Sequence, residues 1–191
     1  MALSDPITGS SEPVVISHPE HKWEFSDGDH GVNEGPQWLE SPNGNWKGVV
    51  YSCAGSWTKD YKLAMLTYTG GDPLKKSSWR KERHPLVENA GQNGDNPPFG
   101  PGHCSFLPLS GGEYVCCFHG TDKQTDGWEN RKCRAQRLAW TNDGPYMGGI
   151  VGPHVNDFNT FMSGPPPPGA QGGAPKEHGI KGLLHKIKNE L

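Results

Sequence analysis

One glutamate stands between residues that control backbone shape, in the segment Asn33-Glu34-Gly35-Pro36. Glycine permits backbone angles closed to other residues and proline fixes φ, so the segment predicts a tight turn that presents the Glu34 carboxyl group. A carboxyl group held against aromatic surface can stay protonated and act as a general acid. Aromatic residues near in sequence are Trp23, Trp38, Trp46 and Trp57. Taken alone, so short a motif is more often a solvated loop residue.

The stretch after Glu34 contains one pattern twice. A turn is followed by an aromatic-led strand, a long polar loop and a second strand. The predicted strands are 46–51 and 61–69 in the first copy, and 113–118 and 133–140 in the second. Polar loops rich in Trp, His, Arg and Gly fall at the same end of both hairpins, as a shared central site requires. The repeat therefore favours blades of a β-propeller over an ordinary β-sandwich.

Shorter elements are predicted before and between the two copies. The apolar run Val14-Val15-Ile16 predicts a strand that Trp23-Glu24-Phe25 continues, and residues 27–31 predict a connecting loop. The run 27–31 lacks the spacing and terminal glutamate of an EF-hand, so it does not predict a calcium loop. Core or blade-packing roles are expected for Trp46, Trp79 and Trp140.

Composition restricts the class of protein. Only 32% of the 191 residues are hydrophobic, while 27 are glycine and 18 are proline, which is typical of short strands joined by tight turns. The net charge of −3 is spread along the chain without a basic block, which disfavours nucleic acid as a partner. No apolar run is long enough to predict a membrane span, and the first residues have neither the basic nor the apolar region of a signal peptide.

The five cysteines are odd in number and have no C-x-x-C spacing, which disfavours a zinc site or a full disulfide framework. Cys116 and Cys117 are adjacent in a predicted strand, so they should face opposite sides and serve as small core residues. An alternative nucleophile is Cys104 beside His103. That alternative is weak because no second histidine or orienting carboxylate is associated with it.

The last part of the chain changes character. A proline- and glycine-rich stretch predicts a disordered, extended linker at 151–178, after a β domain at 1–150. Apolar residues at helical spacing and flanking lysines then predict a short basic amphipathic helix at 179–191. Alone it would be marginal in water, so we expect it to order against a partner, a membrane surface or the β domain.

Seven ordered blocks between about Pro6 and Gly148 resemble glycoside hydrolase family 43, most of all its exo-acting arabinofuranosidase-like members. The blocks are Val32-Asn33-Glu34-Gly35-Pro36-Gln37, Tyr51-Ser52-Cys53-Ala54-Gly55-Ser56-Trp57-Thr58, Asp60-Tyr61-Lys62-Leu63, Gly71-Asp72-Pro73-Leu74, Gly100-Pro101-Gly102-His103-Cys104-Ser105-Phe106, Phe118-His119-Gly120 and Arg134-Ala135-Gln136. The resemblance implies an all-β, five-bladed β-propeller of the α-L-arabinofuranosidase and β-xylosidase type. It implies an extracellular enzyme that needs no cofactor and acts on plant cell-wall-type arabino- or xylo-saccharides, whereas the chain carries no evident export signal.

The same resemblance implies roles for individual residues. It makes Glu34 the general acid of an inverting hydrolase. It places His119 at the propeller axis, near a hydrated calcium or sodium ion, and makes His103 a site-facing histidine. It assigns Trp57 and Arg134 to loops that border the sugar pocket, and Arg131 more loosely.

The resemblance also implies a partial propeller, the C-terminal half. In the family, the catalytic base and the aspartate that tunes the acid come from blades upstream of the matched blocks. Without the carboxylate that activates water, we expect the isolated chain to be inactive. The alternative is a non-catalytic carbohydrate-binding or interaction protein derived from such a propeller. A third possibility is a dimer that closes the ring, and the oligomeric state stays open.

Overall fold

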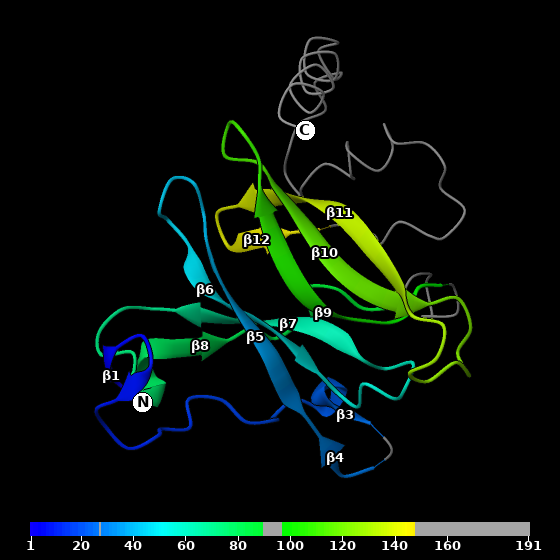
Figure 1. Cartoon of the computed structure of the whole chain (residues 1–191), viewed down its shortest axis with the longest axis horizontal. Helices are drawn as coiled ribbons and strands as arrows, with labels where there is room; N and C mark the ends of the chain where they lie inside the picture. The colour runs from blue at the N-terminus through cyan, green and yellow to red at the C-terminus, as the bar shows by residue number, and fades with distance from the viewer. Residues whose placement is uncertain (27, 90–96, 148–191) are drawn as a thin grey trace.

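Two four-stranded antiparallel sheets make up most of the computed structural model, which describes residues 1–147 apart from residue 27 and residues 90–96. In each sheet, strands consecutive in the chain are neighbours, so each sheet is a simple meander (Figure 1). The first has β5 (Asn33–Glu40), β6 (Lys47–Cys53), β7 (Lys62–Tyr68) and β8 (Trp79–Lys81), and the second has β9 (Phe99–Pro108), β10 (Tyr114–Thr121), β11 (Lys132–Thr141) and β12 (Gly144–Tyr146). A four-stranded meander is the form of a propeller blade.

Smaller elements lie before and between the sheets. Two hairpins pair β1 (Leu3–Asp5) with β2 (Thr8–Gly9), and β3 (Phe25–Ser26) with β4 (His30–Gly31). Two short 3-10 helices precede strands: η1 (Lys22–Glu24) and η2 (Lys76–Ser78). Over the described residues, the structure is therefore all-β apart from these two turns of 3-10 helix.

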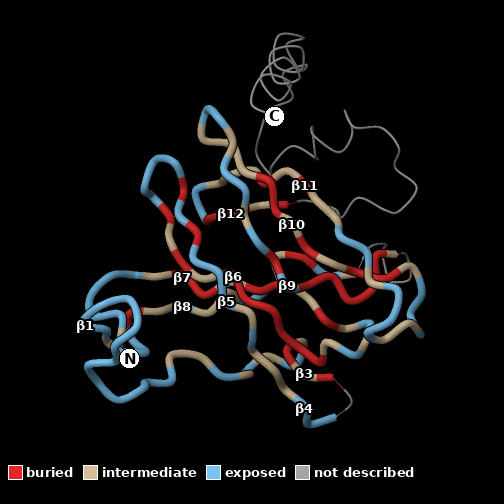
Figure 2. Tube along the Cα trace, in the orientation of Figure 1, coloured by how far each residue is buried: buried red, intermediate tan, exposed pale blue. Residues whose placement is uncertain are grey.

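The main core lies between the two sheets (Figure 2). Because side chains alternate along a strand, Val50 of β6 and Leu63 of β7 reach this core, where they join Phe118 of β10. On the opposite face of the first sheet, Tyr51 and Leu66 form a second cluster that Ile16 and Trp23 cover. Two packed faces explain why β6 and β7 are apolar on both sides.

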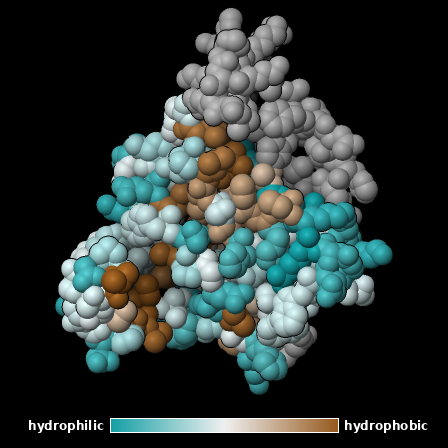
Figure 3. Space-filling view, in the orientation of Figure 1, coloured by the Kyte–Doolittle hydropathy of each residue, from teal (hydrophilic) through white to brown (hydrophobic). Residues whose placement is uncertain are grey.

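Tryptophans pack the blades as expected. Trp46 is buried and its ring centroid lies 6.0 Å from that of Trp140, while Trp79 packs edge-on against Trp38. Hydrophobic side chains also gather on the surface over the N-terminal hairpin, where Met1 and Leu3 are exposed (Figure 3).

The two predicted hairpins are confirmed as β6–β7 and β10–β11, but three local predictions are wrong. The predicted strand at Trp23-Glu24-Phe25 is mostly the 3-10 helix η1, and only Phe25 begins a strand. Asn33-Glu34-Gly35-Pro36 is not a tight turn: it opens strand β5, and a register shift between Glu34 and Gln37 absorbs Gly35, whose φ is 56°. Residues 14–16 form no strand, and Val15 is exposed, because no neighbouring strand pairs with them.

The chain after 147 lies outside the described residues. The predicted linker at 151–178 and helix at 179–191 therefore stay predictions, as does the boundary at residue 150. Within the part that the structure describes, no helix is long and apolar enough to cross a membrane.

Candidate active site

The Glu34 carboxylate is exposed at the start of β5 and is held by one buried phenol. The Tyr61 hydroxyl donates a hydrogen bond of 2.7 Å to Oε1 of Glu34, and only 1% of Tyr61 is exposed. Ser52, which lies opposite Glu34 in the β5–β6 register, also hydrogen-bonds Tyr61. Burial raises the pKa of Tyr61; Ser52 opposes this shift and Glu34 adds to it, so the phenol stays protonated as a donor. The aromatic group that contacts the acid is thus a tyrosine, not one of the nearby tryptophans.

The ring of Tyr61 is fixed between the two sheets. A Cβ atom added to Gly102 of β9 would lie 2.2 Å from Cε1 of Tyr61, so only glycine leaves room for this ring. His119 of β10, which lies opposite Gly102 in the register, stacks on Tyr61 with ring centroids 5.7 Å apart. His103 then stacks on His119 at 6.3 Å, and its backbone N–H donates to Ser52 Oγ at 2.8 Å. The site thus joins both blades.

His119 is neutral in this setting. Burial, then the Arg131 guanidinium and then His103 lower the pKa of His119 to about 4. Its Nδ1 is buried and has no hydrogen-bond partner among the described residues. A buried polar atom in a native protein normally has a partner, so this nitrogen suits a polar ligand or an ordered water.

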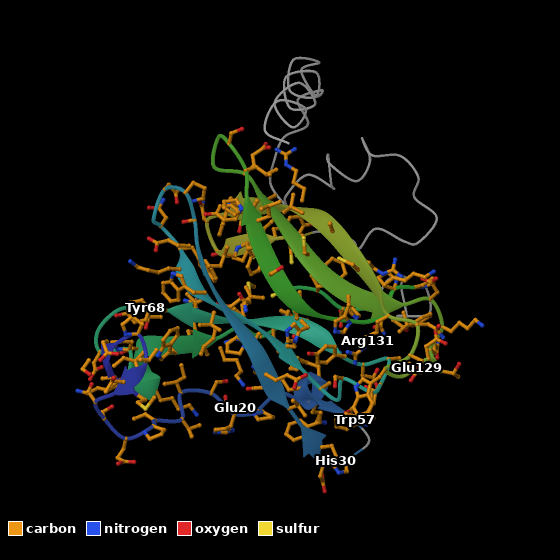
Figure 4. All side chains as sticks on the ribbon, viewed as in Figure 1. Glu20, His30, Trp57, Tyr68, Glu129 and Arg131 are labelled. Atoms are coloured by element: carbon orange, nitrogen blue, oxygen red, sulfur yellow. The ribbon has the colours of Figure 1, made fainter. Side chains whose placement is uncertain are left out.

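Arg131 links this cluster to an aromatic corner. Its Nη2 donates to the Ser56 carbonyl at 2.8 Å, and it acts electrostatically on both Tyr61 and His119. In Figure 4, Arg131 and Trp57 lie in the same corner of the molecule. Of the three residues predicted to border the sugar pocket, Arg131 therefore acts on the Glu34 cluster, and Trp57 lies beside Arg131.

Arg134 has a different position. Its Nη2 pairs with Asp122 at 2.6 Å, and its Nε is buried without a partner in the described structure. The ion pair therefore joins β11 to the loop after β10, and a direct role at Glu34 stays a prediction.

The alternative nucleophile is unsuited to its role. Cys104 is 2% exposed and belongs to the core between the sheets. Its hydrogen bond to Cys116, together with burial, raises the pKa of the Cys116 thiol. All five cysteines are free. Cys116 and Cys117 face opposite sides as predicted, but only Cys116 is a core residue, and Cys117 is half-buried.

A buried ion pair lies behind the acid, on the outer face of the first sheet. Glu24 is fully buried and pairs with Lys81 of β8 at 2.8 Å. Asn33, next to Glu34, donates to Glu24 at 2.8 Å, and Tyr51 donates to it at 2.9 Å. Burial acts to raise the pKa of Glu24, but these donors and two backbone N–H groups outweigh it and lower the pKa to about 2. The first residue of β5 is thereby anchored from outside while the second faces the site.

Residue types alone did not single out several members of the site. Ser52 and Tyr61 stand in strand-like runs and resemble core residues, although both fall within the blocks that carry the family resemblance. Trp128, in the loop before β11, donates its indole N–H to Ser56 Oγ and has no such block. Position in the chain could have identified them, because Ser52, Tyr61 and Trp128 all lie at the loop end of a predicted hairpin.

A metal ion has limited support. Among residues 1–147 as described, no group of three or more His, Cys, Asp or Glu side chains is arranged to hold one. The buried Nδ1 of His119, which has no partner among the described residues, favours a ligand, whereas the positive charge of Arg131 disfavours a cation. A calcium or sodium ion at the axis thus stays an expectation of the resemblance, and no step below depends on it.

Known arabinofuranosidases are similar to this chain. Extracellular exo-alpha-(1->5)-L-arabinofuranosidase of Streptomyces avermitilis is 27% identical over 170 residues, which cover 82% of this chain and 34% of that protein. Alpha-L-arabinofuranosidase B of Pyricularia oryzae is 32% identical over 162 residues, 80% of this chain and 32% of the relative. The chain therefore spans about a third of the length of these relatives.

Solved structures agree. An alpha-L-arabinofuranosidase from Lactobacillus brevis superposes with a TM-score of 0.65 at 28% identity, over 78% of this chain and 46% of that one. A thermostable family-43 glycoside hydrolase, at 22% identity and a TM-score of 0.59, supports the fold alone. The two sheets and the shared site between them thus define part of a propeller-type glycoside hydrolase domain. Residues 1–146 match the glycosyl hydrolases family 43, and the chain belongs to this family.

Proposed function

We propose that this chain carries the acid half of an inverting glycoside hydrolase site for arabinose- or xylose-containing polysaccharides. The observation that supports this role is the exposed Glu34 carboxyl group, fixed by the buried Tyr61 phenol at the junction of two blades. The names of the relatives, all arabinofuranosidases, support the substrate class.

In this reaction Glu34 protonates the departing glycosidic oxygen. The Tyr61 hydroxyl donates a hydrogen bond to Oε1 of Glu34 and so orients the carboxyl group. The neutral His119 and the cationic Arg131 supply polar contacts for sugar hydroxyls. Stacking of Tyr61, His119 and His103 keeps these groups in one arrangement and so reduces the entropy lost on binding.

An inverting hydrolase also needs a second carboxylate, about 6.5 to 9.5 Å from the acid, to activate water. From the family resemblance, we propose that this carboxylate comes from blades upstream of the matched blocks. We therefore propose that the isolated chain is inactive as a hydrolase. Assay with aryl α-L-arabinofuranosides and β-D-xylosides tests this: we expect no hydrolysis. Turnover that is lost in Glu34→Gln would show that a base is present.

A second candidate function is carbohydrate binding without catalysis. The buried Nδ1 of His119, which has no hydrogen-bond partner among the described residues, favours it, because a polar ligand or an ordered water would satisfy this atom. Calorimetric titration with arabino- and xylo-oligosaccharides tests it. Binding that persists in Glu34→Gln supports this function, and absence of binding to the unmodified protein removes it.

The predicted 179–191 helix keeps its proposed role of contacting a partner or membrane surface.

A further inference from the structure

We infer that Trp128 and Trp57 form a stacking site for a second sugar unit of the polysaccharide, next to the sugar bound at Glu34; this inference rests on the proposed function. Trp128 lies in the loop before β11 and is 63% exposed, and Trp57 lies in the loop before β7 and is 41% exposed. Their rings meet edge to face, with centroids 6.3 Å apart and an angle of 76° between planes. Two blades thus present a corner formed by two aromatic rings.

The corner is built rigidly, although both rings lie on loops. Ser56 joins the loops: Trp128 Nε1 donates to its hydroxyl at 3.0 Å, and Arg131 Nη2 donates to its carbonyl at 2.8 Å. Trp57 packs directly on Gly55, where a Cβ atom would lie 2.8 Å from the indole ring. The Gly55 N–H in turn donates to the hydroxyl of buried Ser26 at 2.8 Å. Exposed aromatic rings held this way lose little conformational freedom when a ligand binds.

The corner is continuous with the Glu34 cluster through Arg131. Its guanidinium lowers the pKa of His119 and acts on Tyr61, the residue bonded to Glu34, while the same guanidinium holds the backbone between Gly55 and Trp57. Figure 4 places Trp57, Arg131 and Glu129 together at one corner of the molecule. A chain of sugar units that occupies the Glu34 site can therefore extend over this corner.

The chemistry of the corner suits a sugar ring better than an apolar ligand. A sugar offers C–H groups on its faces and hydroxyl groups at its edge. The C–H groups pack on indole rings, and the hydroxyls bond to the Arg131 guanidinium or the Glu129 carboxylate at the rim. The surrounding surface in this corner is largely hydrophilic (Figure 3). Two exposed rings in a polar setting are therefore a recognition site and not an uncovered piece of core.

Isothermal titration of the full chain with L-arabinose and with linear α-1,5-arabinotriose tests the inference. The variants are Trp128→Ala and, as matched control, Trp38→Ala, which removes another exposed ring, on β5 and outside this corner. We expect arabinotriose to bind Trp128→Ala about five- to tenfold more weakly than the unmodified protein, and Trp38→Ala to bind it unchanged. Arabinose, which fills only the Glu34 site, should not distinguish the variants.

A second readout uses the indole N–H signals in ¹H–¹⁵N spectra. The signal of Trp128, whose N–H is bonded to Ser56, should shift with arabinotriose and not with arabinose. If Trp128→Ala binds arabinotriose as tightly as the unmodified protein, the stacking site is wrong while the proposed function stands. If the unmodified protein binds neither sugar, the proposed function fails and this inference fails with it.

Discussion

The buried phenol of Tyr61 donates a 2.7 Å hydrogen bond to the exposed carboxylate of Glu34 across the first sheet. The two residues lie 27 positions apart, on β5 and just before β7, and Ser52 of β6 lies between them. This hydrogen bond therefore forms only when β5, β6 and the start of β7 pack correctly at the loop end of the first sheet.

A double-mutant cycle between Tyr61 and Glu34 should give a coupling energy of about 1.5 to 3 kcal/mol, as for a hydrogen bond to a charged group. The variants are Tyr61→Phe, Glu34→Ala and the pair, and the measurement is the free energy of unfolding in urea. Glu40, an exposed glutamate at the other end of β5, is the control. Tyr61→Phe combined with Glu40→Ala should be additive, and equal coupling in both cycles would contradict the assignment.

His119 should titrate with a pKa near 4 and be neutral at pH 6. Arg131→Gln removes a nearby positive charge and should raise this pKa, while Arg80→Gln, at an exposed position of β8, should not, as NMR titration of the His119 ring can show. Because the folded-state pKa lies below the ordinary 6.5, the unfolded chain binds the proton more readily. The contribution of His119 to the free energy of unfolding should therefore fall as the pH drops from about 6.5 to about 4. An unchanged pKa in Arg131→Gln would mean that burial and His103, not Arg131, cause the shift.

Gly102→Ala should destabilise the protein by about 1 to 3 kcal/mol, because the new Cβ would overlap the Tyr61 ring. The same substitution in a Tyr61→Ala background removes the overlapping ring and should cost less. Thermal unfolding of the four proteins measures the difference. An equal cost in both backgrounds would place the strain in the backbone of β9 and not at Tyr61.

The sequence predicted the hairpins well and the segment around Glu34 poorly, for one physical reason. Nearly continuous apolar runs in β6 and β7 reflect contacts on both faces, so the pattern is visible locally. Gly35 and Pro36 predict a turn by local rules, but pairing with β6 keeps the chain extended and places Gly35 in a bulge. The run Val14-Val15-Ile16 has strand-like residues and no strand beside it. Pairing partners, which are set by tertiary structure, decided both cases.

The roles of the predicted site residues stay predictions, and the structure gives only their positions. Trp57, His103, His119 and Arg131 were named from family resemblance, and the structure gathers them near Glu34 through Tyr61 and Ser56. Tyr61 itself is buried and resembles a core residue in sequence. Its hydroxyl has a role only because the Glu34 carboxylate lies within hydrogen-bond distance. The fully buried Glu24 was read as part of a strand, because nothing local reveals a Lys81 that lies 57 residues away.

The ion pair between Glu24 and Lys81 provides the last prediction. Removal of one partner leaves a buried charge without compensation, so Lys81→Met should lower the free energy of unfolding by about 3 to 5 kcal/mol. Lys76→Met, which breaks an exposed pair with Glu20, should cost about 1 kcal/mol or less.

The pH dependence separates the two pairs further. The pKa of Glu24 lies near 2 in the folded protein, below its ordinary value of 4.5, so its contribution to stability is full above about pH 4.5 and is lost as the pH falls toward 2. In Lys81→Met the strongest donor to this carboxylate is gone, so the loss should begin at higher pH. Urea unfolding between pH 2.5 and 6 measures both curves. Parallel curves for the unmodified protein and Lys81→Met would mean that the backbone donors and Asn33, not the lysine, hold Glu24 ionised.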